Sequence, residues 1–328
     1  MKKTLLTLAL SLAACKAADQ PPSLAGADAA VAVDAARPAE GPDLATAPDL
    51  ALVEHIDPNG GGGTVGLLHF GTFGDIRPPL PDDVFQYPST VASAIFAGMA
   101  KSQPQFVVGT GDYMFAEFSA SIVQQQLAKL ADAEKSIIAP FFHAMGNHEC
   151  NSLSELNCPN LDESPNIKTY LSTLVPWASG VPWFSFIVHT SLGDAKFVFI
   201  ASNAWNDTQA AWLKQVLAVS TTYTFIVRHI PSPDAGTMST TAGVTASDAI
   251  IAGRPVTLWL FGHVHEYKHL TTNSVIAGNA GAPLAAGEYG WVEVQQRPDG
   301  TVGVTAYSMA TGMPTDAWAV TPDGAKSP

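Results

Sequence analysis

The chain has 328 residues, and its 16 basic against 29 acidic side chains give a formal net charge of −13 at pH 7. Such a charge repels nucleic-acid backbones and anionic lipid surfaces, so we expect no nucleic-acid partner. An anionic ligand would bind only where a cation reverses the local field.

The N-terminus has the pattern of an export signal. Two lysines precede an apolar stretch over residues 5–12 that is too short to span a bilayer. Leu12-Ala13-Ala14-Cys15 then resembles a bacterial lipobox, which predicts a signal peptide over 1–14 and a lipid on Cys15. An ordinary secretory signal with a coincidental cysteine is the alternative. The lipoprotein interpretation predicts an exported protein of the bacterial cell envelope, at the outer membrane or the periplasmic face. Its only membrane contact would be the N-terminal lipid.

Residues 15–63 are expected to form the lipidated cysteine and a disordered tether. The segment is rich in Ala, Pro and Asp, poor in large apolar side chains, and ends in four glycines at 60–63. A chain of this composition buries too little apolar surface to fold. Residues 64–328 are expected to form one domain of the α/β class.

From about residue 65, strand and helix patterns alternate. We expect a strand over 65–73, a helix over 89–101, a strand over 106–108, a helix over 119–135 and a strand over 136–145. Strands over 184–188 and 196–201 come next, followed by a helix that Asp207 caps. Two buried strands, 223–228 and 256–261, precede short strands between about 274 and 320. The shapes of segments 150–183 and 231–254 are not predicted.

Polar motifs directly follow several of these strands: Gly74-Asp75, Gly111-Asp112, Gly146-Asn147-His148-Glu149, His229 and Gly262-His263-Val264-His265. In open α/β sheets, ligands bind in the crevice at the carboxyl ends of the strands, so residues far apart in sequence converge there. Carboxylate, amide and imidazole groups are the ligands that Mn, Fe and Zn prefer. The shared placement of the motifs therefore predicts a metal site.

In this order, the motifs resemble those of calcineurin-like metallophosphoesterases, and they are most similar to the purple acid phosphatase-like branch. The resemblance covers about residues 65–310. It implies a four-layer α/β/β/α sandwich with two mixed β-sheets, and hydrolysis of phosphate esters by a metal-bound hydroxide. A phosphomonoesterase with a small-molecule phosphate-ester substrate is favoured. A phosphodiesterase and a catalytically impaired surface binding lipoprotein are the alternatives.

The resemblance also implies a role for each motif residue. Two divalent or trivalent metal ions, Fe, Mn or Zn, would bind, the first to Asp75, Asp112 and His265 and the second to Asp112, Asn147, His229 and His263. Asp112 would bridge the two ions. His148 would be catalytic, as proton donor or charge stabiliser at the leaving-group oxygen. Glu149 would orient an imidazole.

The sequence departs from the family pattern at two positions. The first family motif is Asp-x-His, but Asp75-Ile76-Arg77 has an arginine in place of the histidine, and arginine cannot ligate a metal. The purple branch uses instead a tyrosine three residues after the second-motif aspartate, where this chain has Phe115. We therefore expect weak binding of the first metal. Arg77 is a catalytic candidate that would clamp phosphate through two N–H groups, with an exposed ion-pair residue as the alternative.

Three cysteines are present, and lipidation of Cys15 would leave two. In an oxidising envelope compartment, a disulfide between Cys150 and Cys158 is favoured over two free thiols. It would close a small loop directly after the Asn-His motif and stiffen it.

Overall fold

The computed structural model describes residues 54–117, 119–150, 158, 164–233 and 241–327. The chain divides into two units, residues 1–50 and 51–328. The predictions for the signal peptide, for a lipid on Cys15 and for the tether over 15–53 fall outside the described residues. Within these residues, no helix is long and apolar enough to cross a membrane.

The folded part begins earlier than the sequence predicts. β1 (His55–Ile56) pairs in antiparallel orientation with β2 (Gly63–Thr64), which in turn pairs with β6 (Phe184–Thr190). The four glycines at 60–63 shape the turn between β1 and β2, and all four have positive φ, the region that favours glycine. The boundary expected at residue 63 is therefore corrected, because residues 54–63 belong to the fold.

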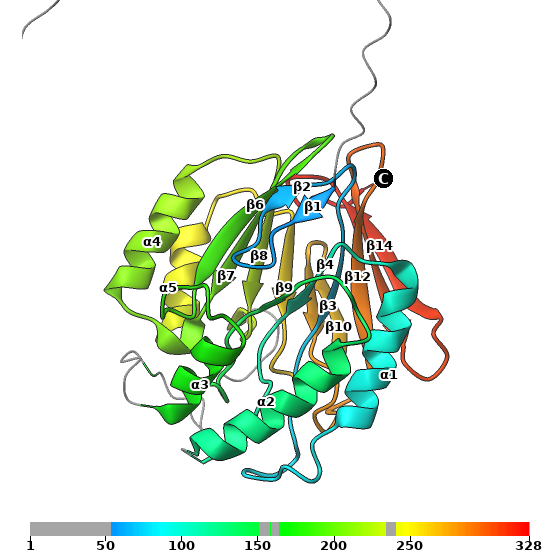
Figure 1. Cartoon of the computed structure of the whole chain (residues 1–328). Helices are drawn as coiled ribbons and strands as arrows, with labels where there is room; N and C mark the ends of the chain where they lie inside the picture. The colour runs from blue at the N-terminus through cyan, green and yellow to red at the C-terminus, as the bar shows by residue number, and fades with distance from the viewer. Residues whose placement is uncertain (1–53, 118, 151–157, 159–163, 234–240, 328) are drawn as a thin grey trace, which may run out of the picture. The chain divides into compact units, whose positions relative to one another are not determined.

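Two mixed β-sheets form the centre of the fold (Figure 1). Besides β1, β2 and β6, the first sheet contains β7 (Gly193–Ile200), β8 (Tyr223–Arg228), β9 (Leu258–Phe261), β10 (Tyr267–Thr271) and β11 (Ser274–Ala277). The second contains β3 (His69–Phe73), β4 (Phe106–Gly109), β5 (Phe141–His143), β12 (Gly290–Gln296), β13 (Val302–Ser308) and β14 (Pro314–Val320). The strand orders are β1-β2-β6-β7-β8-β9-β11-β10 and β14-β13-β12-β3-β4-β5.

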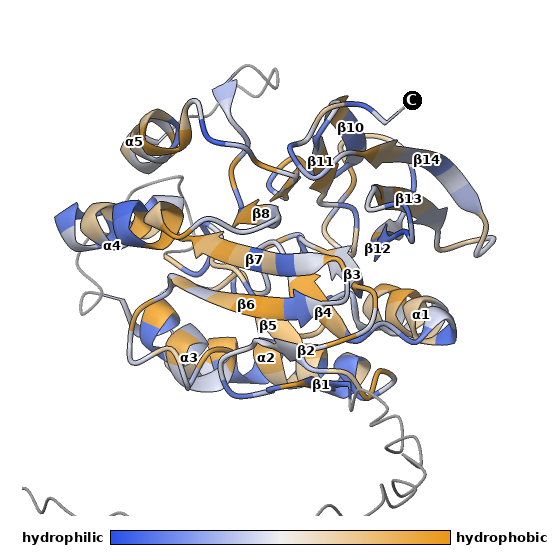
Figure 2. Cartoon of the chain, turned by 90° about the horizontal axis from the view of Figure 1, so that it is seen from above, coloured by the Kyte–Doolittle hydropathy of each residue, from blue (hydrophilic) through white to orange (hydrophobic). Residues whose placement is uncertain are grey.

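Helices cover the outer faces of both sheets (Figure 2). The second sheet is covered by α1 (Ser89–Met99), α2 (Ala120–Glu134) and α3 (Pro165–Thr173), and the first by α4 (Asp207–Ala218) and α5 (Ala242–Ile251). Two short 3₁₀ helices, η1 (Ala100–Ser102) and η2 (Ser202–Ala204), also lie in the described part of the chain. The predicted α/β/β/α sandwich with two mixed sheets is confirmed.

Aromatic side chains fill the space between the two sheets. Phe70 of β3 stacks on Phe106 of β4, with 5.2 Å between the ring centroids. Phe70 also packs edge-to-face against Phe197 of β7 and Phe225 of β8, at 5.1 and 5.4 Å. Each such pair contributes about 0.5–1.5 kcal/mol beyond the burial of its area. These contacts hold the strands of the two sheets in fixed relative positions, and thereby the loops at their ends.

Most predicted elements are present, with differences at their ends. Asp207 is the first residue of α4, whereas Asn206 caps the helix and accepts a hydrogen bond from the Gln209 N–H at 2.9 Å. The expected cap is therefore wrong by one residue. β5 has only three residues of the strand expected over 136–145, and α3 and α5 lie in the segments for which no shape was predicted.

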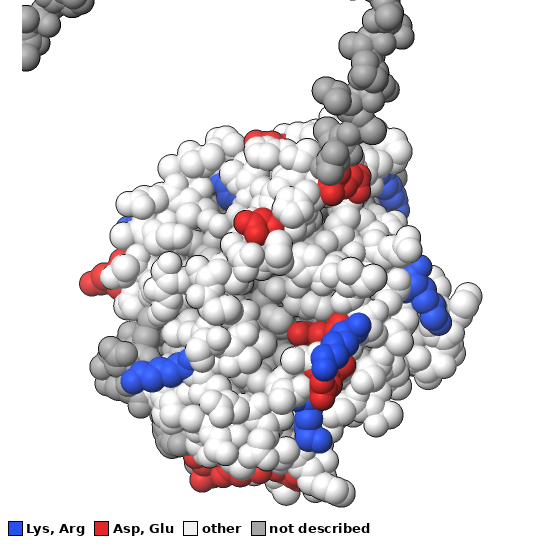
Figure 3. Space-filling view, viewed as in Figure 1, with Lys and Arg blue, Asp and Glu red and all other residues white. Residues whose placement is uncertain are grey.

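Charged side chains are sparse on the face shown in Figure 3. On the described part of this face, Lys and Arg side chains are scattered and do not gather into a broad basic patch. Where its residues are described, this face therefore offers no broad positive field that would attract an anionic ligand.

Candidate metal centre

The predicted metal-binding residues lie on loops that follow parallel strands. Three of these strands, β3, β4 and β5, are neighbours in one sheet, and β8 and β9 are neighbours in the other. The loops of the two sheets meet through direct contacts. His229 after β8 lies 2.9 Å from the Thr110 carbonyl after β4, and the His263 N–H after β9 donates to the Asp75 carboxylate after β3. All six predicted residues are brought to this one place.

Backbone conformation at the centre is unusual. Asp75, Asp112 and His263 have φ values of 61°, 61° and 73°, and they are three of the six described non-glycine residues with positive φ. Such conformations cost about 1–3 kcal/mol each and persist where the surrounding structure enforces them. Here the chain turns sharply after a strand and directs the side chain towards residues of the other motifs.

The glycines that precede the ligand candidates make room for them. A Cβ atom on Gly146 would lie 2.2 Å from Asp112 Oδ1, and one on Gly262 would lie 2.7 Å from Asp75 Oδ2. Both separations are far below van der Waals contact. Gly146 and Gly262 are therefore required by the close approach of a carboxylate that a different motif supplies.

At the position predicted for the second metal, a histidine nitrogen faces two side-chain oxygens that only accept hydrogen bonds. His229 Nδ1 lies 2.9 Å from the Thr110 carbonyl, which only accepts, so Nδ1 carries a proton. Nε2 of the neutral ring then presents a lone pair, yet it lies 3.1 Å from Asn147 Oδ1 and 3.3 Å from Asp112 Oδ2. Three atoms with lone pairs repel one another at these distances unless a second proton or a cation lies among them.

The spacing of these atoms fits a metal ion. His263 Nδ1 adds a fourth candidate donor, 3.1 Å from Asn147 Oδ1. Two ligands that each lie about 2.1 Å from a metal, at angles of about 90–110°, are roughly 3.0–3.4 Å apart. His229, Asn147, Asp112 and His263 thus have the donor types and the separations required around one ion.

The pKa values at this position agree with metal binding. Burial by itself lowers the pKa of His229, but the adjacent Asp112 carboxylate raises it to about 9. Burial lowers the pKa of His263 to about 3, so its ring is neutral near pH 7, as a metal ligand must be. A bound cation would replace the second proton of His229, so metal binding would release that proton.

The position predicted for the first metal contains Asp75 and His265. Asp75 is fully buried, and its Oδ2 accepts the His263 N–H at 3.0 Å. Asp75, Asp112 and His229 are buried side chains that could hold a metal ion, with ligand atoms within 4.8 Å of one another. His265 Nε2 lies 3.5 Å from Asp75 Oδ1, and its Nδ1 lies 2.9 Å from the Pro283 carbonyl. Nδ1 therefore carries the proton, and Nε2 presents its lone pair to the centre.

Arg77 lies at this first position. Its Nη2 donates to His265 Nε2 at 3.2 Å, and its Nε lies 3.8 Å from Asp112 Oδ2. The Arg77 Cζ atom lies 4.8 Å from the centroid of the Phe115 ring. Because the lone pair of His265 is already satisfied by a guanidinium, the donors here do not fit a metal ion as those of the second position do.

The family model of the calcineurin-like phosphoesterases matches residues 70–267. The chain belongs to the calcineurin-like phosphoesterase family. The family predicted from the motifs is therefore confirmed, and with it the assignment to the metallophosphoesterases. No curated protein matches the sequence.

Solved structures share the fold of this phosphoesterase at low sequence identity. Purple acid phosphatase PPD1 from yellow lupin seeds is 14% identical, with a TM-score of 0.58, over 80% of this chain and 56% of the lupin chain. A dimetal phosphatase from Danio rerio is 12% identical, with a TM-score of 0.54, over 79% and 100% of the two chains. GAP50, the anchor in the inner membrane complex of Plasmodium, is 13% identical, with a TM-score of 0.53, over 79% and 90%. The phosphoesterase thus spans little more than half of the lupin protein.

His148 and Glu149 both contact Asp112. The His148 N–H donates to Asp112 Oδ1 at 3.0 Å, and its Nε2 lies 3.7 Å from Asp112 Oδ2. The buried Glu149 carboxylate accepts the N–H groups of Gly146, Asp112 and Tyr113 at 2.6, 3.0 and 2.8 Å. Glu149 was expected to orient an imidazole, but its hydrogen bonds join the backbones of two ligand loops.

Arg228 is a supporting residue that the sequence does not reveal. It is fully buried next to His229, and it donates to the Ile230 carbonyl, to both Ser247 and Asp248 at 2.7 Å, and to Ser232 at 2.7 Å. Its Cζ atom lies 5.4 Å and 5.5 Å from the Trp259 and Phe261 ring centroids. This network ties the loop after β8 to α5. In the sequence, this buried role is indicated only by the position of Arg228 at the end of an apolar strand.

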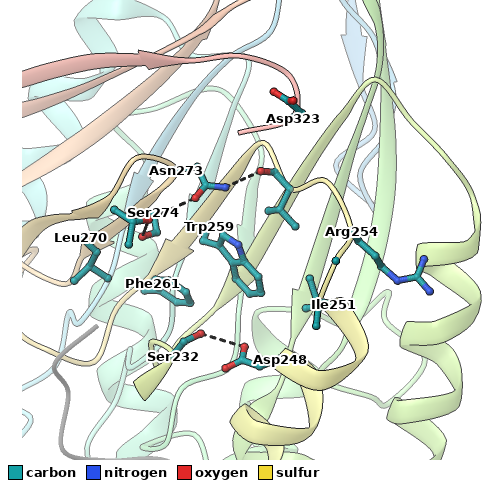
Figure 4. A pocket seen from close by; sticks show the side chains of 14 residues that line it. Ser232, Asp248, Ile251, Arg254, Trp259, Phe261, Leu270, Asn273, Ser274 and Asp323 are labelled. Atoms are coloured by element: carbon teal, nitrogen blue, oxygen red, sulfur yellow. Dashed lines mark hydrogen bonds between the residues drawn. The ribbon is translucent and has the colours of Figure 1, made fainter. Parts of the chain in front are cut away.

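A cavity of about 440 Å³ lies on the other side of this network (Figure 4). It is bounded by the end of α5, by β9 and by the β10–β11 hairpin, and Asp248, Trp259 and Phe261 are among the residues that line it. None of the predicted metal-binding residues lines it. The cavity is therefore separate from the candidate metal centre.

Cys150 and Cys158 form a disulfide, with their Cα atoms 5.7 Å apart. The Cys150 N–H donates to the Asn147 carbonyl at 3.0 Å, so the disulfide begins within one turn of a ligand candidate. The residues between the two cysteines lie outside the described residues. The covalent link anchors the end of the Asn-His motif.

Proposed function

We propose that this phosphoesterase hydrolyses phosphate monoesters in a metal-dependent reaction. The observation that carries the proposal is the convergence of His229 Nε2 with the Asn147 and Asp112 side-chain oxygens, with separations of 3.1 and 3.3 Å. A metal ion held there, Mn, Fe or Zn by the nature of the donors, would polarise a phosphoryl oxygen and lower the pKa of a water molecule.

The charge of the centre supports a monoester substrate. A phosphate monoester carries a charge of about −1.5 to −2 at pH 7, while a diester carries about −1. Burial raises the pKa of Asp75 to about 8, so its carboxyl group would be fully ionised at pH 7 only with a cation beside it. With Asp75 and Asp112 both ionised, two negative charges face the one positive charge of Arg77. With a divalent ion the centre would carry about one net positive charge, which favours the more highly charged ester.

His148 is proposed as the proton donor to the leaving group. Its side chain reaches the centre, and its Nδ1 is a buried atom without a hydrogen-bond partner among the described residues. Burial lowers its pKa to about 4, with Asp112 opposing and Arg77 adding to this shift. A dianionic substrate would raise the pKa again and favour the protonated donor.

Replacing His148 by alanine should therefore affect esters with different leaving groups unequally. We expect kcat for an alkyl phosphate to fall about 10²–10⁴-fold, because an alkoxide needs a proton as it leaves. The loss for 4-nitrophenyl phosphate should be much smaller, because nitrophenolate is a stable anion. His189→Ala, at an exposed histidine paired with Asp194, is the control. Equal losses for both esters would exclude proton donation by His148.

The monoester assignment is tested by a comparison of two chromogenic substrates. Full-length protein loaded with Mn²⁺, Fe or Zn²⁺ is assayed with 4-nitrophenyl phosphate and with bis(4-nitrophenyl) phosphate. We expect kcat/KM for the monoester to be at least about tenfold higher, a difference of roughly 1.4 kcal/mol in transition-state stabilisation. A faster diester would identify a phosphodiesterase. Metal-loaded protein that hydrolyses neither substrate would identify a binding protein.

We also propose that the phosphoesterase is exported and lipid-anchored in the bacterial envelope. The proposal is supported by the lipobox around Cys15 and by the two cysteines joined in a disulfide, a bond typical of oxidising compartments. Labelled palmitate should enter the wild-type protein in cells but not the Cys15→Ala variant. Equal labelling of both would refute the anchor.

A further inference from the structure

We propose that Arg77 takes the place of the first metal ion, so that the centre holds one metal ion and one permanent guanidinium charge. The inference rests on the proposed function, because it assumes that the second position binds a metal. This role of Arg77 differs from that of a phosphate clamp at the rim of a two-metal site. The guanidinium lies between His265 and Asp112, two of the residues predicted to bind the first ion.

The contacts of Arg77 show how it fills this position. Its Nη2 uses the lone pair of His265 Nε2 at 3.2 Å, and the Pro283 carbonyl fixes the ring in the matching tautomer. Its Nε faces Asp112 Oδ2 at 3.8 Å and has no hydrogen-bond partner among the described residues. The side chain is only 12% exposed. A metal ion at this position would have to displace the guanidinium or lie beside it against charge repulsion.

The Arg77 guanidinium lies over the ring of Phe115. The Arg77 Cζ atom lies 4.8 Å from the Phe115 centroid, within the range of a cation–π interaction, and the Phe115 ring lies 4.3 Å from the His148 ring. Arg77 Nη1 also donates to the Pro78 carbonyl at 3.1 Å. Phenylalanine offers an aromatic face but no oxygen ligand. The two departures from the family pattern, Arg77 and Phe115, are therefore in contact and act together.

With Arg77 in place of the first metal ion, one positive charge of the centre would be permanent. An arginine keeps its positive charge at all relevant pH values, and a chelator cannot remove it. The Arg77 guanidinium therefore places a positive charge beside the Asp112 carboxylate before any metal binds. The remaining donors of His229, Asn147, Asp112 and His263 would then bind one ion.

Metal content tests the inference. The full-length protein is saturated with Mn²⁺ and freed of excess metal by gel filtration. Manganese per chain is then measured by mass spectrometry, and spin coupling by electron paramagnetic resonance. We expect one uncoupled ion in the wild type, and two coupled ions in Arg77→His and in the double variant Arg77→His with Phe115→Tyr. Arg254→His is the control and should keep one ion, because Arg254 follows α5 and donates to the Leu217 carbonyl of α4, outside the centre.

Two ions in the wild type would overturn the inference, and so would one ion in both Arg77 variants if their circular dichroism shows a native fold. No bound ion in the wild type would refute the metal centre itself, and this inference with it. One bound ion without ester hydrolysis would refute the proposed function but leave this inference standing. The two proposals can therefore fail separately.

Discussion

An Asp112→Asn variant is expected to lose ester hydrolysis by roughly 10³-fold or more, because it removes the charge that the other groups of the centre face. Asp112 Oδ2 lies 3.3 Å from His229 Nε2, 3.7 Å from His148 Nε2 and 3.8 Å from Arg77 Nε. Asparagine has nearly the same shape, so the loss would come from charge and ligand strength and not from a cavity. The measurement is kcat together with the metal content of the purified variant.

Asp194→Asn is the matched control for this variant. Asp194 is an exposed aspartate that also pairs with a histidine, His189, at 2.8 Å, but it lies outside the centre. We expect its kcat and its metal content to remain unchanged. An Asp112→Asn protein that retains both its metal and more than about a tenth of the wild-type kcat would show that Asp112 is not a ligand.

Replacing Arg228 by methionine should reduce the free energy of unfolding by about 3–5 kcal/mol, because it breaks a buried ion pair and leaves its partner groups unsatisfied. Arg228 is fully buried, whereas Asp248, its partner at 2.7 Å, is 29% exposed. In a domain of this size we expect the melting temperature to fall by roughly 10 °C. Urea denaturation of the full-length, metal-free protein measures the loss directly.

Lys214→Met provides the comparison for the Arg228 variant, because Lys214 is an exposed basic residue on α4. Its substitution should change the unfolding free energy by no more than about 0.5 kcal/mol. Since Arg228 directly precedes His229, the Arg228 variant should also bind metal more weakly. If Arg228→Met were as stable as wild type, the network around Arg228 would not hold the loop in place.

The fold and the location of the centre could be predicted because the same physical pattern recurs along the chain. Each motif follows an apolar strand, and the carboxyl ends of parallel strands lie at one edge of a sheet. The backbone therefore places Asp75, Asp112 and His229 near one another whatever their rotamers. The glycines of the motifs could be recognised in the sequence, but only the structure shows that Gly146 and Gly262 make room for the carboxylates of Asp112 and Asp75.

The role of Arg77, the turn at residues 60–63 and the contacts of Glu149 could not be predicted, because they depend on side-chain direction and on neighbours distant in sequence. The sequence left Arg77 open between a phosphate clamp and an exposed ion-pair residue, and its contact with His265 depends on the Phe115 ring beneath it. The glycines at 60–63 have the composition of a linker, but strand pairing on both sides makes them a turn. Glu149 bonds to backbone N–H groups, which carry no residue-specific signal in the sequence.

Removal and return of the metal tests the central claim most directly. Hydrolysis of 4-nitrophenyl phosphate by the full-length protein is measured before chelation, after chelation, and after addition of Mn²⁺, alongside a His263→Ala variant. We predict that activity falls to the buffer rate on chelation and returns with bound manganese in the wild type but not in the variant. Turnover that survives complete removal of metal, or full turnover without His263, would contradict a metal-dependent phosphoesterase centre at this position.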